Sequence, residues 1–148
     1  MKIEDEIRQP KFSSPHQKAV INLIFTANWL VNRQHDFFKP FGITGQQFNV
    51  LRILKGQHPK SISANEIKSR MLDKNSDMSR LLDRLLKKNL ISKSVCPEDK
   101  RASNVFITEH GLNLLKDISR RQAEIDKILS LTEDEAVQLS LLLDKGRG

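Results

Sequence analysis

The chain has 148 residues, a length typical of one domain that folds without metal or disulfide support. Lysine and arginine outnumber aspartate and glutamate by 25 to 18, which gives a net charge of +7. The basic excess is concentrated in residues 60–101, which hold eleven basic and six acidic side chains. This bias favours a polyanionic partner, although excess lysine also serves solubility.

Cysteine content and hydropathy exclude several classes of protein. The single cysteine, Cys96, cannot form an intramolecular disulfide and favours a reducing compartment, so we expect the cytoplasm. The most apolar stretch, residues 19–31, is too short to cross a bilayer, and acidic residues 4–6 stand where a signal peptide needs positive charge. The histidines lack metal-ligand spacing and no nucleophile or phosphate-binding motif is present. We therefore expect no membrane partner, no metal, no cofactor and no enzymatic activity.

The first predicted element is a long helix. Residues 1–13 show no apolar periodicity, so the sequence predicts a loose arm there. A helix is predicted from Ser14 to about Phe38, because Pro40 and Gly42 follow. Its apolar side chains form two adjoining stripes, which are Val20, Ile24, Ala27 and Val31, and Ile21, Leu23, Phe25 and Leu30. We expect an apolar surface of this width to be buried against another part of the protein or against a partner.

Three shorter helices are predicted next. Residues 44–47 and 63–66 both have the capping-box pattern, and each precedes apolar residues at helical spacing. These two helices are expected to end near Gly56 and Leu72. After a polar turn, residues 73–76, the fourth helix has the clearest amphipathic pattern in the chain, formed by Met78, Leu81, Leu82, Leu85 and Leu86. Asn89 is its expected left-handed cap.

Between Leu90 and Thr108 the pattern changes from helix to strand. The segments LISKSV and NVFIT are rich in β-branched residues and flank turn formers at 97–99, so they predict a two-stranded ribbon. Helical spacing resumes over residues 112–129, and a third capping box at 132–135 opens a last helix. The predicted fold class is therefore mainly α with a small two-stranded β-wing.

Two short helices followed by a ribbon outline a winged helix-turn-helix, in which the second helix enters the DNA major groove. If the apolar residues of the fourth helix face inward, its opposite face is free for this role. The candidate DNA contacts are Ser63, Asn65, Lys68, Asn75, Ser76, Asp77, Ser79, Arg80, Arg84, Lys87, Asp99, Lys100 and Arg101. We expect the first three to meet phosphates, and the last two to reach the minor groove and its flank. The alternative is a solvated helix face and an ordinary charged hairpin tip.

Four stretches of the chain follow one another across about residues 43–115: ITGQQFNVLRIL, SANEIKSRM, MSRLLDRLLKKNLISK and PEDKRASNVFITEHGLNLL. Together, in this order and at these spacings, they resemble the MarR family of bacterial winged-helix regulators. The most specific part is Ser-Arg-x-x-Asp-Arg-Leu at 79–85, followed by Asp-x-Arg at 99–101 and Ile-Thr-x-x-Gly at 107–111. The resemblance implies a homodimer that binds a pseudo-palindromic operator and is often released by a small ligand or by oxidation.

The resemblance also implies an organisation of the chain. It makes residues 1–148 a single MarR-type domain, with dimerisation helices at 14–38 and 109–148 and a DNA-binding core at 43–108. A ligand pocket in this family lies between the dimerisation and DNA-binding parts, so Trp29, His35 and Phe38 are candidate lining residues. Ordinary packing is the alternative for each of them.

The sequence departs from the family pattern just before the fourth helix. The residue there is usually acidic and caps the helix, but here it is Lys74, so Asp73 or Asn75 is expected to cap instead. Asp77 would repel phosphate and could accept a hydrogen bond from a cytosine amino group. A redox role is not transferred to Cys96, since it lies at the wing and not in the first helix.

The function predicted from the sequence is sequence-specific binding of double-stranded DNA by a homodimeric transcriptional regulator, expected to be a repressor. The alternative is a winged-helix protein-interaction module that binds no DNA. The polar face of the fourth helix and the wing residues Lys100 and Arg101 favour DNA, whereas Asp77 and Asp83 slightly favour the alternative.

Overall fold

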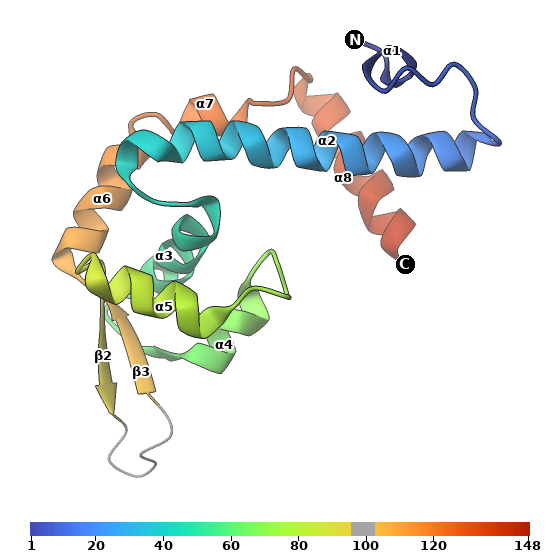
Figure 1. The fold of residues 1–148 in the computed structure, drawn as a ribbon. Coiled ribbons are helices and arrows are strands. Elements are labelled where there is room, and N and C mark those ends of the chain that lie inside the picture. The colour runs from blue at the N-terminus through green and yellow to red at the C-terminus, as the bar shows by residue number, and fades with distance from the viewer. Residues whose placement is uncertain (96–102) are drawn as a thin grey trace. The chain divides into compact units, whose positions relative to one another are not determined.

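The computed structural model describes residues 1–95 and 103–148, and the structural statements below concern these residues. The chain divides into two compact units, Met1–Gly45 and Gln46–Gly148, which are described separately. Figure 1 labels their elements along the chain. None of the described helices has the length and apolar character needed to span a membrane.

The first unit is dominated by one long helix, α2 (Pro15–Phe38), which confirms the predicted helix. The Ser14 hydroxyl accepts a hydrogen bond from the Gln17 backbone N–H at 3.0 Å, and proline occupies the first helical position. A short 3-10 helix, η1 (Lys39–Phe41), follows and ends at Gly42, whose φ of 72° is left-handed. Glycine adopts this conformation without steric cost, so the chain turns there.

The expectation of a loose arm over residues 1–13 is wrong. A short helix, α1 (Ile3–Glu6), forms there and buries Ile3, which is 5% exposed. Lys18 of α2 forms an ion pair with Glu4 of α1. A four-residue helix is too short to produce a 3.6-residue apolar period, so periodicity does not detect it.

The second unit contains six further helices and a small sheet. The N-cap hydrogen bond of two predicted capping boxes is confirmed: the Ser63 and Thr132 hydroxyls each accept a hydrogen bond at 3.2 Å, from the N–H of Glu66 and of Glu135. Asn89 has a φ of 58°, as expected of a left-handed cap. The helices are α3 (Gly45–Gln57), α4 (Ala64–Arg70), α5 (Met78–Lys87), α6 (Glu109–Ser119), α7 (Gln122–Asp126) and α8 (Glu133–Arg147).

The sheet has three antiparallel strands in the order β1-β3-β2. The predicted ribbon is confirmed as β2 (Ile91–Val95) paired with β3 (Ser103–Ile107), and it projects from the helices of this unit (Figure 1). The prediction of two strands was incomplete, because β1 (Ile62–Ser63) pairs with β3 through Ile62 and Val105. A two-residue strand cannot show alternation, so periodicity does not detect it.

The core of the second unit is built from helices α3, α4, α5 and α6 together with the sheet. Its most completely buried side chains include Leu51, Leu54, Ile67, Leu82, Leu85, Val105 and Ile118, each at most 1% exposed. These residues come from α3, α4, α5, β3 and α6. The core therefore fixes the two helices and the ribbon of the candidate site.

A close backbone contact joins the end of the α5 region to the start of α6. A Cβ atom on Gly111 would lie 2.4 Å from the Leu90 carbonyl oxygen, so only glycine fits there. The Thr108 hydroxyl donates to the Asn89 carbonyl at 2.7 Å and accepts from the Gly111 N–H at 3.1 Å. The Thr-x-x-Gly motif is therefore the joint between these two helices.

Candidate nucleic-acid interface

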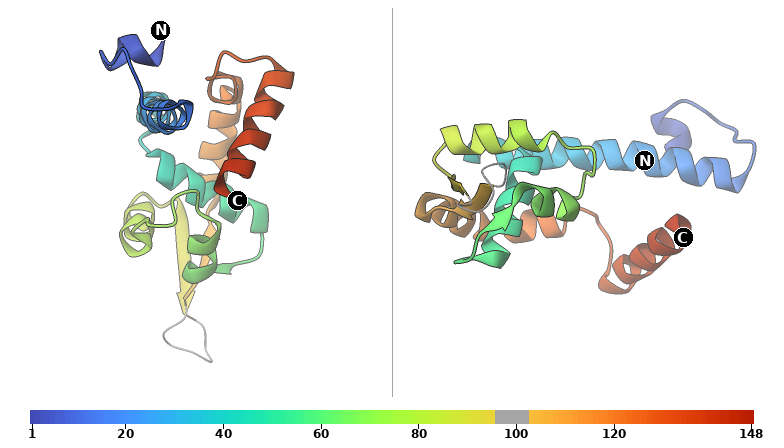
Figure 2. Two further views of the ribbon diagram at one scale, coloured as in Figure 1. Left: turned by 90° about the vertical axis from the view of Figure 1, so that its right-hand side faces the viewer. Right: turned by 90° about the horizontal axis from the view of Figure 1, so that it is seen from below.

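α4, a short turn and α5 form the central part of the candidate site (both views of Figure 2). One face of α5 is buried through residues at helical spacing, namely Met78, Leu81, Leu82 and Leu85. This burial holds the helix against the core of the unit and leaves its opposite face in solvent. The predicted orientation of the helix is therefore confirmed.

The exposed face of α5 is polar and mainly basic. Ser79, Arg80, Arg84 and Lys87 are all exposed, as is Asp83. Within the described part of the chain, none of the three basic side chains forms an ion pair with an acidic group. Each guanidinium or ammonium group is thus available to an external acceptor such as a phosphate or a base edge.

The N-terminal cap of α5 differs from the expectation. Asp77 caps the helix, since its Oδ1 accepts a hydrogen bond from the Arg80 N–H at 3.2 Å. The prediction that Asp73 or Asn75 caps it is wrong, because the helix begins only at Met78. Asp73 serves the preceding turn instead, where its Oδ1 accepts from the Asn75 N–H at 2.9 Å. The Asp77 carboxylate is thus committed to its own helix.

The placement of Ser76 on the exposed face is also wrong. Ser76 is only 5% exposed, and its hydroxyl has no hydrogen-bond partner in the described part of the chain. Its neighbour Asn75 is exposed beside the first turn of α5. A helical-wheel projection extended back beyond Met78 fails at Ser76, because the turn does not follow the helical angle.

The candidate phosphate contacts lie at the start of α4. Asn65 and Lys68 are exposed, as expected of residues that meet phosphates. The Ser63 side chain is half-buried and caps α4 through Glu66. Its hydroxyl is therefore already used within the chain.

Asp99, Lys100 and Arg101 lie outside the described residues. The structure does describe β2 and β3, which lead to this segment.

Among the described residues, no group of three or more histidine, cysteine or acidic side chains could hold a metal ion.

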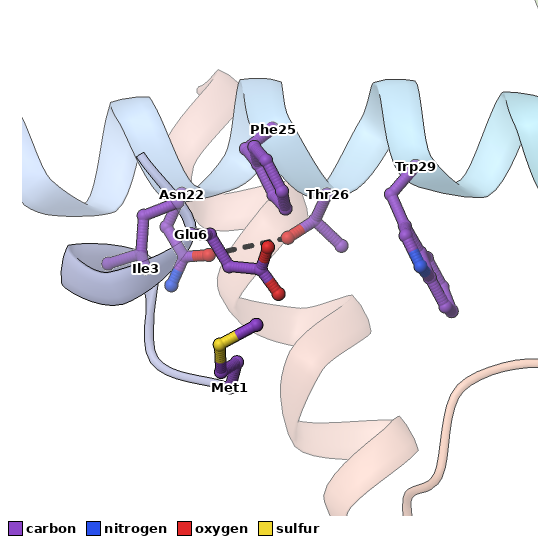
Figure 3. A pocket seen from close by; sticks show the side chains of 7 residues that line it. All are labelled: Met1, Ile3, Glu6, Asn22, Phe25, Thr26 and Trp29. Atoms are coloured by element: carbon purple, nitrogen blue, oxygen red, sulfur yellow. Dashed lines mark hydrogen bonds between the residues drawn. The ribbon is translucent and has the colours of Figure 1, made fainter. Parts of the chain in front are cut away.

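The three candidate ligand-lining residues on α2 are not gathered in one pocket. Trp29 lines a partly open pocket of about 250 Å³ between α1 and α2, where Ile3 and Glu6 face Phe25 and Thr26 (Figure 3). His35 is exposed, and Phe38 is 2% exposed with its ring edge-to-face against Phe37. The sequence did not predict this pocket because it did not predict α1.

The succession of helices α3, α4 and α5, with an exposed polar face on α5, followed by the β2–β3 ribbon defines a winged helix-turn-helix. A model of the MarR family matches residues 43–103. The HTH-type transcriptional regulator MhqR of Bacillus subtilis (strain 168) is 32% identical over 101 residues, which are 66% of this chain and 67% of MhqR.

Solved structures give the same result. The crystal structure of a MarR transcription factor from Planctomyces limnophilus has a TM-score of 0.71 and 30% identity, and the match covers 90% of this chain and 98% of that one. A mutant MarR from E. coli complexed with operator DNA has a TM-score of 0.72 and 26% identity, with 98% of both chains covered. The chain belongs to the MarR family of transcriptional regulators.

Proposed function

We propose that this protein is a sequence-specific, double-stranded DNA-binding transcriptional regulator. The observation that carries the proposal is the exposed face of α5, whose three basic side chains have no ion-pair partner among the described residues while its other face is buried. An α-helix fits the width of the major groove. The structure of a family member complexed with operator DNA supports the same partner.

Base reading is assigned to the N-terminal part of α5. Asn75, Ser79 and Arg80 are exposed at this end of the helix, where recognition helices make their base contacts. Arg84 and Lys87 lie one and two turns further along and suit phosphates. Basic groups outnumber the single Asp83 on this face, which favours DNA over a protein partner.

The wing is assigned to the minor groove. Arg101 suits that groove because a guanidinium is planar, always charged and weakly hydrated. Lys100 is more strongly hydrated and suits the flanking phosphate, and Asp99 is assigned to orient a neighbouring arginine. Asn65 and Lys68 of α4 would contact phosphates on the other side of α5.

The protein is further proposed to act as a homodimer. α2 exposes Val20, Ile24 and Val31 at 56%, 58% and 61%, and their spacing of four and seven residues puts them on one face. α8 exposes Val137, Leu141 and Leu142 at 58%, 63% and 65%. Apolar faces of this kind are typical of surfaces that a second subunit covers.

In this proposal, residues 1–148 act as one MarR-type domain, with dimerisation helices at 14–38 and 109–148 and a DNA-binding core at 43–108. A two-fold symmetric dimer reads a pseudo-palindromic operator. The proposed role is repression in the cytoplasm, relieved by a small-molecule effector. Trp29 is the one residue of the three ligand candidates that lines the pocket of Figure 3.

Selection of bound duplexes from a random DNA pool tests the proposal. We expect an inverted repeat whose half-sites are about one helical turn, ~10 bp, apart. Enrichment of no motif would support the protein-interaction alternative. Affinity for the selected operator should also fall steeply with salt, with a logarithmic slope of about −0.9 per phosphate contact.

Two arginine variants test the assigned contacts. Arg101→Ala and Arg80→Ala should each weaken operator binding by roughly 1–3 kcal/mol, and Arg80→Ala should also relax preference at one base position. The matched control is Arg120→Ala, because Arg120 is an exposed arginine paired with Asp117 on α6. Operator binding by Arg101→Ala equal to that of the parent, at the same salt concentration, would exclude the wing as a DNA contact.

A further inference from the structure

The turn between α4 and α5 is attached to α3 by two side chains. Asn49 of α3 is 4% exposed, and its Oδ1 accepts a hydrogen bond from the Leu72 backbone N–H at 2.9 Å. Gln46 lies one turn earlier on α3, and its Nε2 donates to Asp73 Oδ2 at 3.1 Å. Residues three apart share a helix face, so one face of α3 holds two consecutive residues of the turn.

The hydrogen bond from the Leu72 N–H is what fixes the backbone here, because the Leu72 side chain is not packed in the core. The Leu72 side chain is 82% exposed, whereas that of Met71, just before it, is 2% exposed. The chain therefore leaves the core between these two residues. Asn49 fixes the backbone at this exit point.

Hydrogen bonds continue from this point to the first turn of α5. The Asp73 carboxylate, held by Gln46, accepts from the Asn75 N–H at 2.9 Å, and the Asp73 carbonyl accepts from the Ser76 N–H at 3.3 Å. Asp77 then caps the helix through the Arg80 N–H. The path of the turn, and with it the start of α5, is thus set by α3.

Asn49 is a costly residue for a core position. Its Nδ2 is buried and has no hydrogen-bond partner in the described part of the chain. An unpaired buried donor is unfavourable, and an apolar residue of similar size would avoid this cost. The contribution that an apolar residue cannot make is the acceptor for the Leu72 N–H.

We propose that Asn49 is a positioning residue for operator recognition: it fixes the α4–α5 turn, and so the direction in which α5 presents Asn75, Ser79 and Arg80. This inference rests on the proposed DNA-binding function. At 4% exposure Asn49 acts through the turn and not by contact with DNA. Its effect should therefore fall on base discrimination, which depends on geometry, more than on phosphate attraction.

Two substitutions at this position separate the acceptor from the rest of the side chain. Asn49→Leu removes the acceptor at similar size. Asn49→Asp keeps an acceptor for the Leu72 N–H and replaces only the amide nitrogen that has no partner. The measured quantity is the ratio of affinities for the selected operator and an unrelated duplex at one salt concentration. The added charge of Asn49→Asp weakens binding to both duplexes, so the ratio largely cancels it.

Asn49→Leu should lower this ratio by about tenfold, comparable to the loss of one base-edge contact. Asn49→Asp should retain most of the ratio. Without DNA, hydrogen exchange of the Leu72 amide should be faster than in the parent in Asn49→Leu and close to it in Asn49→Asp. Gln46→Ala, at an exposed position that does not endanger folding, should lower the ratio in the same direction by a smaller factor.

Val50→Ala is the matched control, because Val50 is a fully buried neighbour on α3 without a bond to the turn. It should reduce stability and leave the ratio unchanged. An unchanged ratio in Asn49→Leu, or an equal loss in Val50→Ala, would overturn the positioning role. A parent with no preference for any duplex would instead refute the proposed function, and the Leu72 exchange rates would then still report whether Asn49 holds the turn.

Discussion

α5 and α8 look alike in sequence and differ in the structure. Both are rich in leucine, and both begin with a side-chain cap, Asp77 for α5 and Thr132 for α8. α5 buries four of its ten residues, whereas α8 buries none of its fifteen. An amphipathic pattern thus shows that one face of a helix tends to be buried, but it does not show whether that face packs against the same chain or against another one.

The largest expected difference between these helices concerns their leucines. Leu85 of α5 is fully buried, so Leu85→Ala should lower the free energy of unfolding by about 2–5 kcal/mol. Leu142 of α8 is 65% exposed, so Leu142→Ala should change the stability of the isolated subunit by less than about 0.5 kcal/mol. Urea denaturation at low protein concentration measures both. Equal losses would mean that α8 is packed within its own chain.

The second prediction concerns association. If a second copy covers α8, Leu142→Asp should weaken the proposed dimer by at least about 1.5–3 kcal/mol per copy, the value of burying one leucine. Sedimentation over a range of protein concentrations measures this change. Leu72→Asp, at a leucine that is 82% exposed in the α4–α5 turn, is the control and should leave association unchanged. A dimer insensitive to Leu142→Asp would remove α8 from the interface.

The third prediction compares the two caps. Removal of a side-chain cap costs about 1 kcal/mol of helix stability. Asp77→Ala should lower the free energy of unfolding of the second unit by this amount, because α5 is part of its core. Thr132→Ala should mainly increase hydrogen exchange in the first turn of α8, with little change in the global value. An equal decrease in the global free energy of unfolding in both variants would contradict the view that α8 contributes little to the core of this unit.

The smallest expected effect on stability is at the N-terminus, where the short helix α1 packs against α2 of the same chain. The hydrogen bond from Lys18, followed by the backbone N–H of Glu4, lowers the pKa of the Glu4 carboxyl. A lowered pKa in the folded state means that the ion pair stabilises α1 at neutral pH. This contribution is lost as the pH falls through the lowered pKa. Trp29 fluorescence should report the release of α1 in acid, since Trp29 and Ile3 line one pocket.

Glu4→Gln is the matched variant for this titration, because it keeps the size of the side chain and removes the charge. Its fluorescence should lack the transition assigned to Glu4. A transition of unchanged midpoint in Glu4→Gln would assign the pH dependence to another group.

Much of the fold could be predicted from the sequence because its long elements carry strong periodic signals. α2, α5 and the β2–β3 ribbon were predicted close to their observed bounds, and the caps at Ser14, Ser63 and Thr132 occur at the predicted starts. α1 and β1 were missed because four and two residues cannot show a period. These short elements depend on tertiary contacts instead.

The candidate site was predictable where it lies on a regular helix. Ser79, Arg80, Arg84 and Lys87 are exposed as the helical period predicts. The period carries no information about the turn, so the burial of Ser76 and the capping role of Asp77 were not predicted. The hydrogen bond between Asn49 and Leu72 joins residues 23 positions apart and has no local sequence signal.

The close contact at Gly111 has a mechanical consequence. The Leu90 carbonyl oxygen occupies the place that a Cβ atom of residue 111 would need, and the Thr108 hydroxyl donates to the Asn89 carbonyl, so two successive residues after α5 are held against the start of α6. The two segments are packed as closely as their backbones allow, because any side chain at position 111 would collide with the Leu90 carbonyl oxygen. A change in the tilt of α6 should therefore move the C-terminal end of α5 with it, because the short connection between the two helices cannot absorb the change.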